Sequence, residues 1–312
     1  MPLSPEEQEK GSVEMAAVLA DIAANPWPSD IGEARVLYDK MGPPIAADIR
    51  TQHITLGQVS GLMLTPPELD EDRAVLFLHG GGYVYGSMLS HGGMVAEIAR
   101  AARCRALLLQ YRLAPEHPFP AGIEDACAAY AWLLQQGYRP EQLALIGDSA
   151  GGGLVMSTLV ALKHEGRPMP GAAVCISPWV DLASTGESYL SRQHLDPMID
   201  RNLAEMLAQL YLQEHDRQMP AVSTIHAELD GLPPLLIQVG EREVLFSDAE
   251  RLAARARLAG VDVSFEEWPG MVHVWHLYYP LLTAGRRAIH RVGDFVREKI
   301  VRHAVPAGVN HA

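Results

Sequence analysis

A serine that could act as a nucleophile stands in residues 147–151, which spell Gly-Asp-Ser-Ala-Gly. An apolar run at 143–146 precedes it and a helical pattern at 150–164 follows, so Ser149 should occupy a tight turn between a buried strand and a helix. A serine hydroxyl is a weak nucleophile, and such a turn lifts it to where a general base can reach it. The pentapeptide alone also occurs by chance, but its setting favours acyl transfer through Ser149.

Attack on a carbonyl needs a place for negative charge to develop, and the glycine run at 80–82 could provide it. The run follows directly after an apolar segment at 74–78. Glycines let backbone N–H groups approach a ligand, so we expect the donors to be the amides of Gly81, Gly82 and Ala150. A flexible turn or a phosphate cradle is the alternative, but the glycine spacing of a dinucleotide fingerprint or a P-loop is missing.

An acid that orients the base should follow a later strand, beyond the one predicted at 235–239. Glu241, Glu243 and Asp248 all come after it. We favour Glu243, because Glu241 lies too near the strand end and Asp248 stands where a helix N-cap would. Asp248 remains the alternative, as does a purely structural role for both acids.

A general base is expected after the strand predicted at 261–267, where a loop presents His273. Its imidazole would take the proton of Ser149 and return it to the leaving group. His276 competes with it, and the two histidines could also form a metal pair. No nearby carboxylate or cysteine completes a ligand set, so we expect neither a metal nor another cofactor.

The elements that must position these residues alternate between strand and helix, which predicts an α/β fold with a mostly parallel sheet and right-handed crossovers. The predicted strands cover 52–57, 59–64, 74–79, 105–110, 142–146, 172–176, 235–239 and 261–267, and the predicted helices between and after them cover 91–103, 121–136, 150–164, 248–259 and 281–302.

Two stretches fall outside this alternation: an amphipathic helix at 4–24 with a second short helix at 30–41, and a helical, methionine-bearing insertion at 183–222. We expect them to form a lid, although packing of the first two helices on the outside of the sheet is the alternative. The lid would shape an apolar substrate pocket, and its flexible methionine side chains would allow acyl groups of different shapes to bind. The expected substrate-binding residues are Tyr83, Met15, Trp27, Met198, Met206 and Tyr211. The domains are predicted as lid, 1–50 and 183–222, and catalytic α/β domain, 51–182 and 223–312.

The composition excludes several classes of binding partner. The 312 residues carry a net charge of −13 without a basic cluster, which argues against nucleic acid and anionic membranes. Three cysteines give no disulfide framework, the N-terminus lacks an export signal, and no apolar run could span a bilayer, so we expect a cytoplasmic protein. Pairing of two copies through the strand at 261–267 is a further expectation.

Four motifs in this order resemble the bacterial branch of the hormone-sensitive lipase family of α/β-hydrolases: residues 79–82, 111–121, 147–152 and 177–182. The likeness covers about residues 74 to 300. It implies an α/β-hydrolase fold with an eight-stranded sheet, a helical lid and carboxylesterase activity on a small ester. The triad carried over is Ser149, Glu243 and His273. The motif at 111–121 is predicted to stiffen a loop, with Arg112 and Glu116 paired internally, while Asp148 and His79 serve as hydrogen-bond anchors.

One departure concerns the acid. The family usually places Asp before a two-residue step ending in Leu, whereas this chain has Glu243-Val244-Leu245. A similar run occurs in the sub-branch that resembles monoterpene lactone hydrolases and acetyl-hydrolases, so a lactone or an amide is the alternative substrate. A non-catalytic receptor on the same scaffold is disfavoured by His273, and a dehalogenase would need Asp in place of Ser149.

Overall fold

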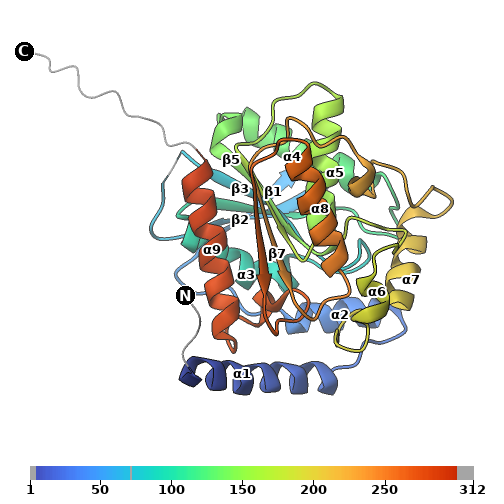
Figure 1. Cartoon of the computed structure of the whole chain (residues 1–312). Helices are drawn as coiled ribbons and strands as arrows, with labels where there is room; N and C mark the ends of the chain where they lie inside the picture. The colour runs from blue at the N-terminus through green and yellow to red at the C-terminus, as the bar shows by residue number, and fades with distance from the viewer. Residues whose placement is uncertain (1–4, 71, 301–312) are drawn as a thin grey trace, which may run out of the picture.

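The computed structural model describes residues 5–70 and 72–300 (Figure 1). Its strands are β1 (Arg50–Leu56), β2 (Val59–Thr65), β3 (Ala74–Leu78), β4 (Arg105–Gln110), β5 (Leu143–Asp148), β6 (Ala172–Ile176), β7 (Leu235–Gly240) and β8 (Val263–Trp268). Its helices are α1 (Pro5–Ala24), α2 (Ile31–Met41), α3 (Met88–Ala102), α4 (Ala121–Gln135), α5 (Ala150–His164), α6 (Ser188–Ser191), α7 (Arg201–Leu212), α8 (Phe246–Leu258) and α9 (Thr283–Lys299). Short 3₁₀ turns are η1 (Pro140–Gln142), η2 (Thr224–His226) and η3 (Trp275–Tyr278).

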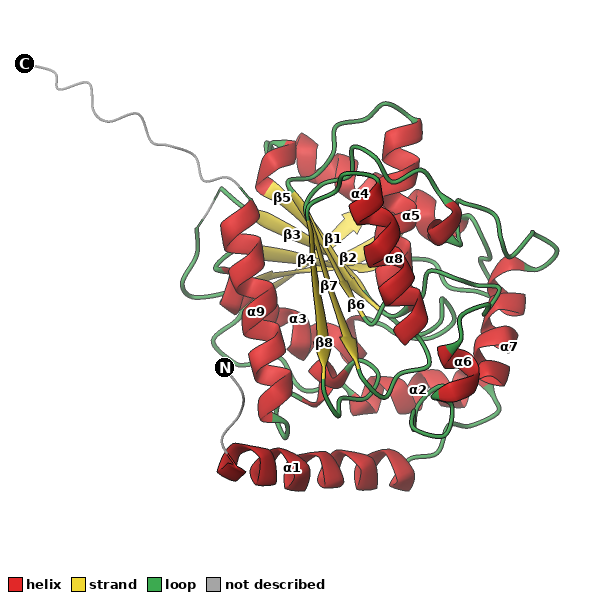
Figure 2. Ribbon diagram, viewed as in Figure 1, coloured by secondary structure: helices red, strands yellow, loops and turns green. Residues whose placement is uncertain are grey.

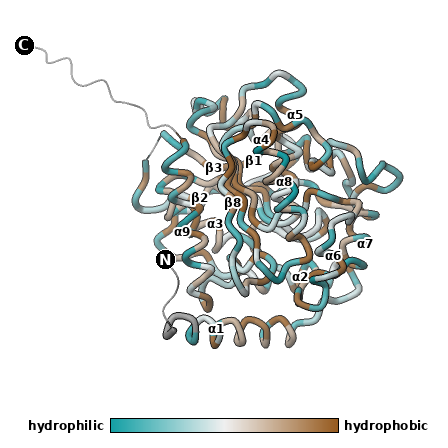
Figure 3. Tube along the Cα trace, in the orientation of Figure 1, coloured by the Kyte–Doolittle hydropathy of each residue, from teal (hydrophilic) through white to brown (hydrophobic). Residues whose placement is uncertain are grey.

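The strands form one sheet in the order β1-β2-β4-β3-β5-β6-β7-β8. The pairs β1–β2 and β2–β4 are antiparallel, and every later pair is parallel. Helices α3 and α9 cover one face, and α4, α5 and α8 cover the other (Figure 2). The central strands β3, β5 and β6 are buried along their whole length, which explains their continuous apolar sequences (Figure 3). The predicted α/β-hydrolase fold with eight strands is confirmed.

The element boundaries differ from the predicted ones by a few residues, and the shift at the start of α3 has a local cause. Helix α3 begins at Met88 rather than at 91, because Ser87 caps it. The Ser87 hydroxyl accepts the Leu89 amide at 2.9 Å, and Ser90 completes a capping box. The added residues place His91 within the first turn of the helix rather than at its first residue.

Helices α1, α2, α6 and α7 lie beyond the carboxyl ends of β7 and β8, at the bottom and lower right of the view in Figure 1. Glu14 of α1 accepts hydrogen bonds from the amide and the hydroxyl of Thr283, both at 2.7 Å. Arg35 of α2 donates to the carbonyl of Val84 at 2.8 Å. These contacts hold the N-terminal helices near the end of the sheet where the candidate residues gather.

Candidate active site

Ser149 lies in the sharp turn between β5 and α5, with φ 55° and ψ −123°. A non-glycine residue in this conformation stores strain of about 1–3 kcal/mol. The turn is possible because its flanking glycines lack a Cβ: one at Gly151 would lie 2.0 Å from the carbonyl oxygen of Leu78, and one at Gly147 would lie 2.3 Å from that of Gly151. The Ser149 amide donates to Ile176 in β6 at 2.8 Å, which fixes the turn against the sheet.

The serine hydroxyl, the imidazole and the acid form a hydrogen-bonded row. Ser149 Oγ lies 2.9 Å from His273 Nε2, and His273 Nδ1 lies 2.9 Å from Glu243 Oε2. Since a carboxylate can only accept, the proton sits on Nδ1, and Nε2 is free to accept the serine proton. All three side chains are buried. The geometry is that of a nucleophile, a general base and an orienting acid.

The electrostatics of the row depend on the pairing of His273 with Glu243. Burial lowers the pKa of His273, but the hydrogen bond and the charge of Glu243 outweigh it, and the pKa lies above the ordinary 6.5. Burial in turn raises the pKa of the Glu243 carboxyl, although the bonded imidazole opposes this. An imidazolium formed during proton transfer would therefore be stabilised by the adjacent acid.

Free backbone donors surround the serine. Within the residues that the structure describes, the amides of Gly81, Gly82 and Ala150 donate to no protein acceptor. Gly81 and Gly82 line the same cavity as Ser149, and Ala150 begins helix α5, whose dipole adds positive potential there. Unpaired N–H groups beside a nucleophile are the donors that an oxyanion needs.

The competing acids have other partners. Asp248 lies inside α8 rather than at its N-cap, and its Oδ2 accepts the amides of Val180 and Asp181 at 3.0 and 2.8 Å. It therefore anchors the loop after β6. Glu241 accepts the amide of Gly270 at 2.7 Å. Of the three acids, Glu243 is the one hydrogen-bonded to His273.

The competing histidine is also occupied. His276 lies in η3, and its Nε2 is 2.8 Å from the side-chain oxygen of Gln238. Burial lowers its pKa to about 3, so its ring is neutral and structural. Among the described residues, no group of three or more His, Cys, Asp or Glu side chains is placed to hold a metal ion.

A narrow apolar cavity of about 170 Å³ opens at Ser149 and His273. Trp27, Met198 and Met206 line it, as the sequence predicts for a substrate pocket. Its wall also includes aromatic and apolar residues that were not predicted to bind the substrate: Tyr38, Tyr85, Trp179, Ile199, Leu203, Leu207 and Leu245.

Three of the expected substrate-binding residues do not line this cavity, and here the prediction needs correction. Tyr83 and Tyr211 stack on each other with ring centroids 3.9 Å apart, and both are buried. Met15 lies along a different groove, beside Trp268 and Met271. A place on an N-terminal helix, in the insertion or in the loop after β3 does not decide which way a side chain faces, and these three side chains pack away from the cavity.

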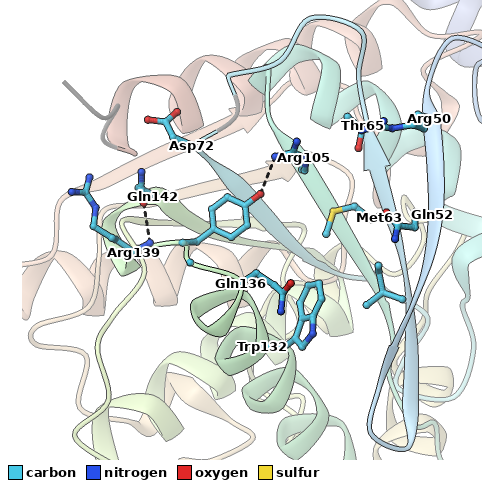
Figure 4. Close-up of a pocket in the computed structure, with 13 residues that line it drawn as sticks. Arg50, Gln52, Met63, Thr65, Asp72, Arg105, Trp132, Gln136, Arg139 and Gln142 are labelled. Atoms are coloured by element: carbon cyan, nitrogen blue, oxygen red, sulfur yellow. Dashed lines mark hydrogen bonds between the residues drawn. The ribbon is translucent and has the colours of Figure 1, made fainter. Parts of the chain in front are cut away.

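A larger and more polar hollow of about 580 Å³ lies at the β1 edge of the sheet, and Figure 4 shows the residues that line it. It is bounded by β1, β2, the start of β4 and the end of α4, with Arg50, Arg105 and Trp132 among its residues. Neither the serine nor the histidine contributes to it. The smaller apolar cavity is therefore the one that the candidate catalytic residues line.

Two polar side chains that support the acid were not anticipated. Ser177, at the end of β6, donates its hydroxyl to Glu243 Oε1 at 2.7 Å and accepts the amide of Val274 at 3.2 Å. Asp196, in the insertion, accepts the amide of Val244 at 3.0 Å. Ser177 follows β6 at the carboxyl edge of the sheet, where Ser149 and Glu243 also lie. That position in the sequence could have marked it as a residue near the site.

The predicted pair of Arg112 with Glu116 is wrong. Arg112 pairs with Asp125 at 2.8 Å, whereas Glu116 is held in a two-pronged bond by Arg35, both at 2.8 Å. Arg35 belongs to α2, so the loop at 111–121 is fastened to an N-terminal helix rather than to itself. Asp148 and His79 do act as anchors, since they bond the amide and the carbonyl of Gly80.

Fold and site together define an α/β hydrolase, and residues 75–277 match the family described as having the alpha/beta hydrolase fold. The chain belongs to this family and is a carboxylic ester hydrolase. It is 44% identical over 281 residues to an acetyl-hydrolase of Streptomyces hygroscopicus, covering 87% of this chain and 92% of that protein. An esterase of Acinetobacter venetianus is 31% identical, over 72% of this chain and 74% of its own.

Solved structures point the same way. An esterase from the bacterial hormone-sensitive lipase family superposes with a TM-score of 0.89 at 45% identity, covering 96% of this chain and 100% of that one. EstE5 superposes with a TM-score of 0.90 at 43% identity, covering 92% and 98%. The resemblance inferred from the four motifs is confirmed. None of the described helices is long and apolar enough to cross a membrane.

Proposed function

We propose that this esterase hydrolyses small to medium acyl esters through a covalent acyl-enzyme. Ser149 is the nucleophile, His273 the general base and acid, and Glu243 the group that orients the imidazole. The observation that carries the proposal is the row of two 2.9 Å hydrogen bonds joining these side chains. A non-catalytic receptor would have no use for a base in hydrogen-bond contact with a buried serine.

The chemistry runs in two halves. As Ser149 Oγ bonds to the substrate carbonyl carbon, its proton passes to His273 Nε2, and the new oxyanion accepts hydrogen bonds from the amides of Gly81, Gly82 and Ala150. Collapse breaks the bond to the alcohol, which leaves with the proton from Nε2. A water then attacks the acyl group in the same way, and the serine is released as the acid product departs.

The cavity argues for modest acyl groups. Its volume of about 170 Å³ and its apolar lining suit short to medium chains better than long ones. Trp27 and Met198 contribute to it from 1–50 and 183–222, so we propose that these segments form the lid over a catalytic domain of 51–182 and 223–312. Met198 and Met206 are flexible, which favours a range of acyl shapes.

A lactone is an internal ester, and the same attack by Ser149 would open it. Lactones and amides are therefore the alternative substrates, and the Glu243-Val244-Leu245 run favours a lactone. We further propose a cytoplasmic location and a homodimer. Support for the dimer is the place of β8 at the edge of the sheet, with its backbone open on one side. Sedimentation that finds only monomer would remove the dimer.

The test is a panel of p-nitrophenyl esters of graded acyl length, with lactones and amides alongside. We expect hydrolysis of the shorter esters, lost by several orders of magnitude in S149A. S157A, a serine further along the same helix α5, is the matched control and should keep its activity. An S149A protein as active as the wild type would refute the mechanism.

A further inference from the structure

A fully buried histidine outside the proposed triad, His91 in the first turn of α3, lies beside the nucleophile turn. Its Nε2–H donates to Asp148 Oδ2 at 3.3 Å. Asp148 directly precedes Ser149, and its other oxygen accepts the amide of Gly80 at 3.0 Å. That amide belongs to the residue just before the two oxyanion glycines. A hydrogen-bonded chain therefore runs from α3 to the oxyanion loop.

The chain has little freedom to shift. A Cβ on Gly80 would lie 2.3 Å from Asp148 Oδ2, so loop and carboxylate are already in close contact. On its other side the His91 ring is fixed by Ser90, whose hydroxyl lies 2.8 Å from Nδ1, and by Tyr38, against which it packs edge-on at 5.5 Å. Each member of the chain is held by its neighbours.

The carboxylate needs a hydrogen-bond donor on this side. Asp148 is completely buried; burial raises its pKa, but its interactions with His91 and, to a smaller extent, with His79 and His273 outweigh this, so the pKa lies below its ordinary value. A buried charge without a partner is strongly unfavourable, and the group would move or take up a proton instead. Either change would disturb the acceptor that holds the Gly80 amide.

We propose that His91 is a positioning residue for the oxyanion hole. By holding Asp148 it fixes the Gly80 amide, and so the directions in which the amides of Gly81 and Gly82 point. The inference rests on the proposed serine mechanism and adds a residue that does not line the cavity. Alignment matters because oxyanion donors act over a narrow range of distance, and a shift of about 1 Å can lower the rate roughly 100-fold.

The experiment compares H91Q with H91N. Both replace the ring by an amide and lose the ring contact with Tyr38, and asparagine is shorter by one methylene. Glutamine carries its amide at the reach of Nε2 and can donate to Asp148, whereas asparagine places it near Ser90. The two readouts are steady-state hydrolysis of p-nitrophenyl butyrate and inhibition by a trifluoromethyl ketone, which forms a tetrahedral adduct with an active serine.

We expect H91N to lower kcat about 10- to 100-fold and to weaken the ketone by a similar factor, with KM changed less than about threefold. H91Q should stay within about threefold of the wild type in both readouts. Equal losses in the two variants, or a loss confined to KM, would overturn the inference.

A second variant covers the case in which H91N does not fold. D148A leaves the Gly80 amide without an acceptor, so it should lower kcat and ketone affinity at least as much as expected for H91N. Unchanged ketone affinity in D148A would contradict the inference. A wild-type protein without esterase activity would contradict the proposed function instead, whereas an active wild type with matching H91N and H91Q contradicts only the role of His91.

Discussion

Replacing Glu243 by glutamine should trap the histidine in the wrong protonation state. Ser177 Oγ–H and Gly240 N–H both donate to Glu243 Oε1, at 2.7 and 2.5 Å. A glutamine must place its carbonyl oxygen there, because its NH₂ group cannot accept from two donors. The NH₂ group then faces His273 Nδ1, which has to become the acceptor. The imidazole proton moves to Nε2, where it blocks acceptance of the proton of Ser149.

The expected loss in kcat for E243Q is about 10⁴-fold, the size seen when an orienting acid becomes an amide that fixes the wrong tautomer. That corresponds to about 5 kcal/mol of transition-state stabilisation. The assay is hydrolysis of p-nitrophenyl butyrate at saturating substrate. E241Q is the matched control, since Glu241 lies two residues away and contacts Gly270 instead of the histidine.

A second comparison tests the choice of acid. D248N replaces the carboxyl group that accepts the amides of Val180 and Asp181, but it leaves the His273 tautomer alone. We expect its main effect to be a lower midpoint of thermal unfolding, with only a minor effect on kcat. If E243Q kept more than a tenth of the wild-type kcat, or if D248N alone abolished turnover, the assignment of Glu243 would be wrong.

Three further predictions follow from the same contacts. S177A removes one of two donors to Glu243 Oε1, so kcat should fall about tenfold while the protein stays folded. Unfolding and activity assays on the same sample check both expectations. Because Glu243 raises the pKa of His273 and only the neutral ring accepts a proton, a profile of kcat/KM should fall on the acid side with its midpoint above 6.5; a midpoint below 6.5 would contradict this. M198W fills part of the cavity, so it should lower the rate of hydrolysis of p-nitrophenyl hexanoate more than that of p-nitrophenyl acetate. Equal losses of rate for the two esters would argue against an acyl site beside Met198.

The arrangement of the three candidate catalytic residues could be anticipated because the fold is simple at that level. Ser149 follows β5, Glu243 follows β7 and His273 follows β8, and the carboxyl ends of parallel strands share one edge of the sheet. The apolar runs in the sequence located the strands. Once the strands are known, residues that follow them can be expected to lie close together even when they are far apart in the sequence. Convergence of the side chains is a consequence of topology.

Side-chain partners across the tertiary structure could not be anticipated. Arg35 reaches Glu116 across 81 positions, and no local pattern distinguishes that partner from the nearer Arg112. The stack of Tyr83 on Tyr211 depends on how the insertion settles against the oxyanion loop. The hydrogen bond of His91 to Asp148 joins residues 57 positions apart, and hydrophobic periodicity does not reveal it. Such contacts are set by packing, and periodicity reports only which face is apolar.

The proposed mechanism depends on one reactive hydroxyl, that of Ser149, and covalent labelling tests it most directly. A fluorophosphonate should attach to Ser149 alone, and mass spectrometry of the digested protein should find the added phosphonyl group on the peptide that contains residues 147–151. H273A should react far more slowly, because its serine has lost the base 2.9 Å away. Labelling at another residue, or no labelling of a folded wild-type protein, would contradict the central claim.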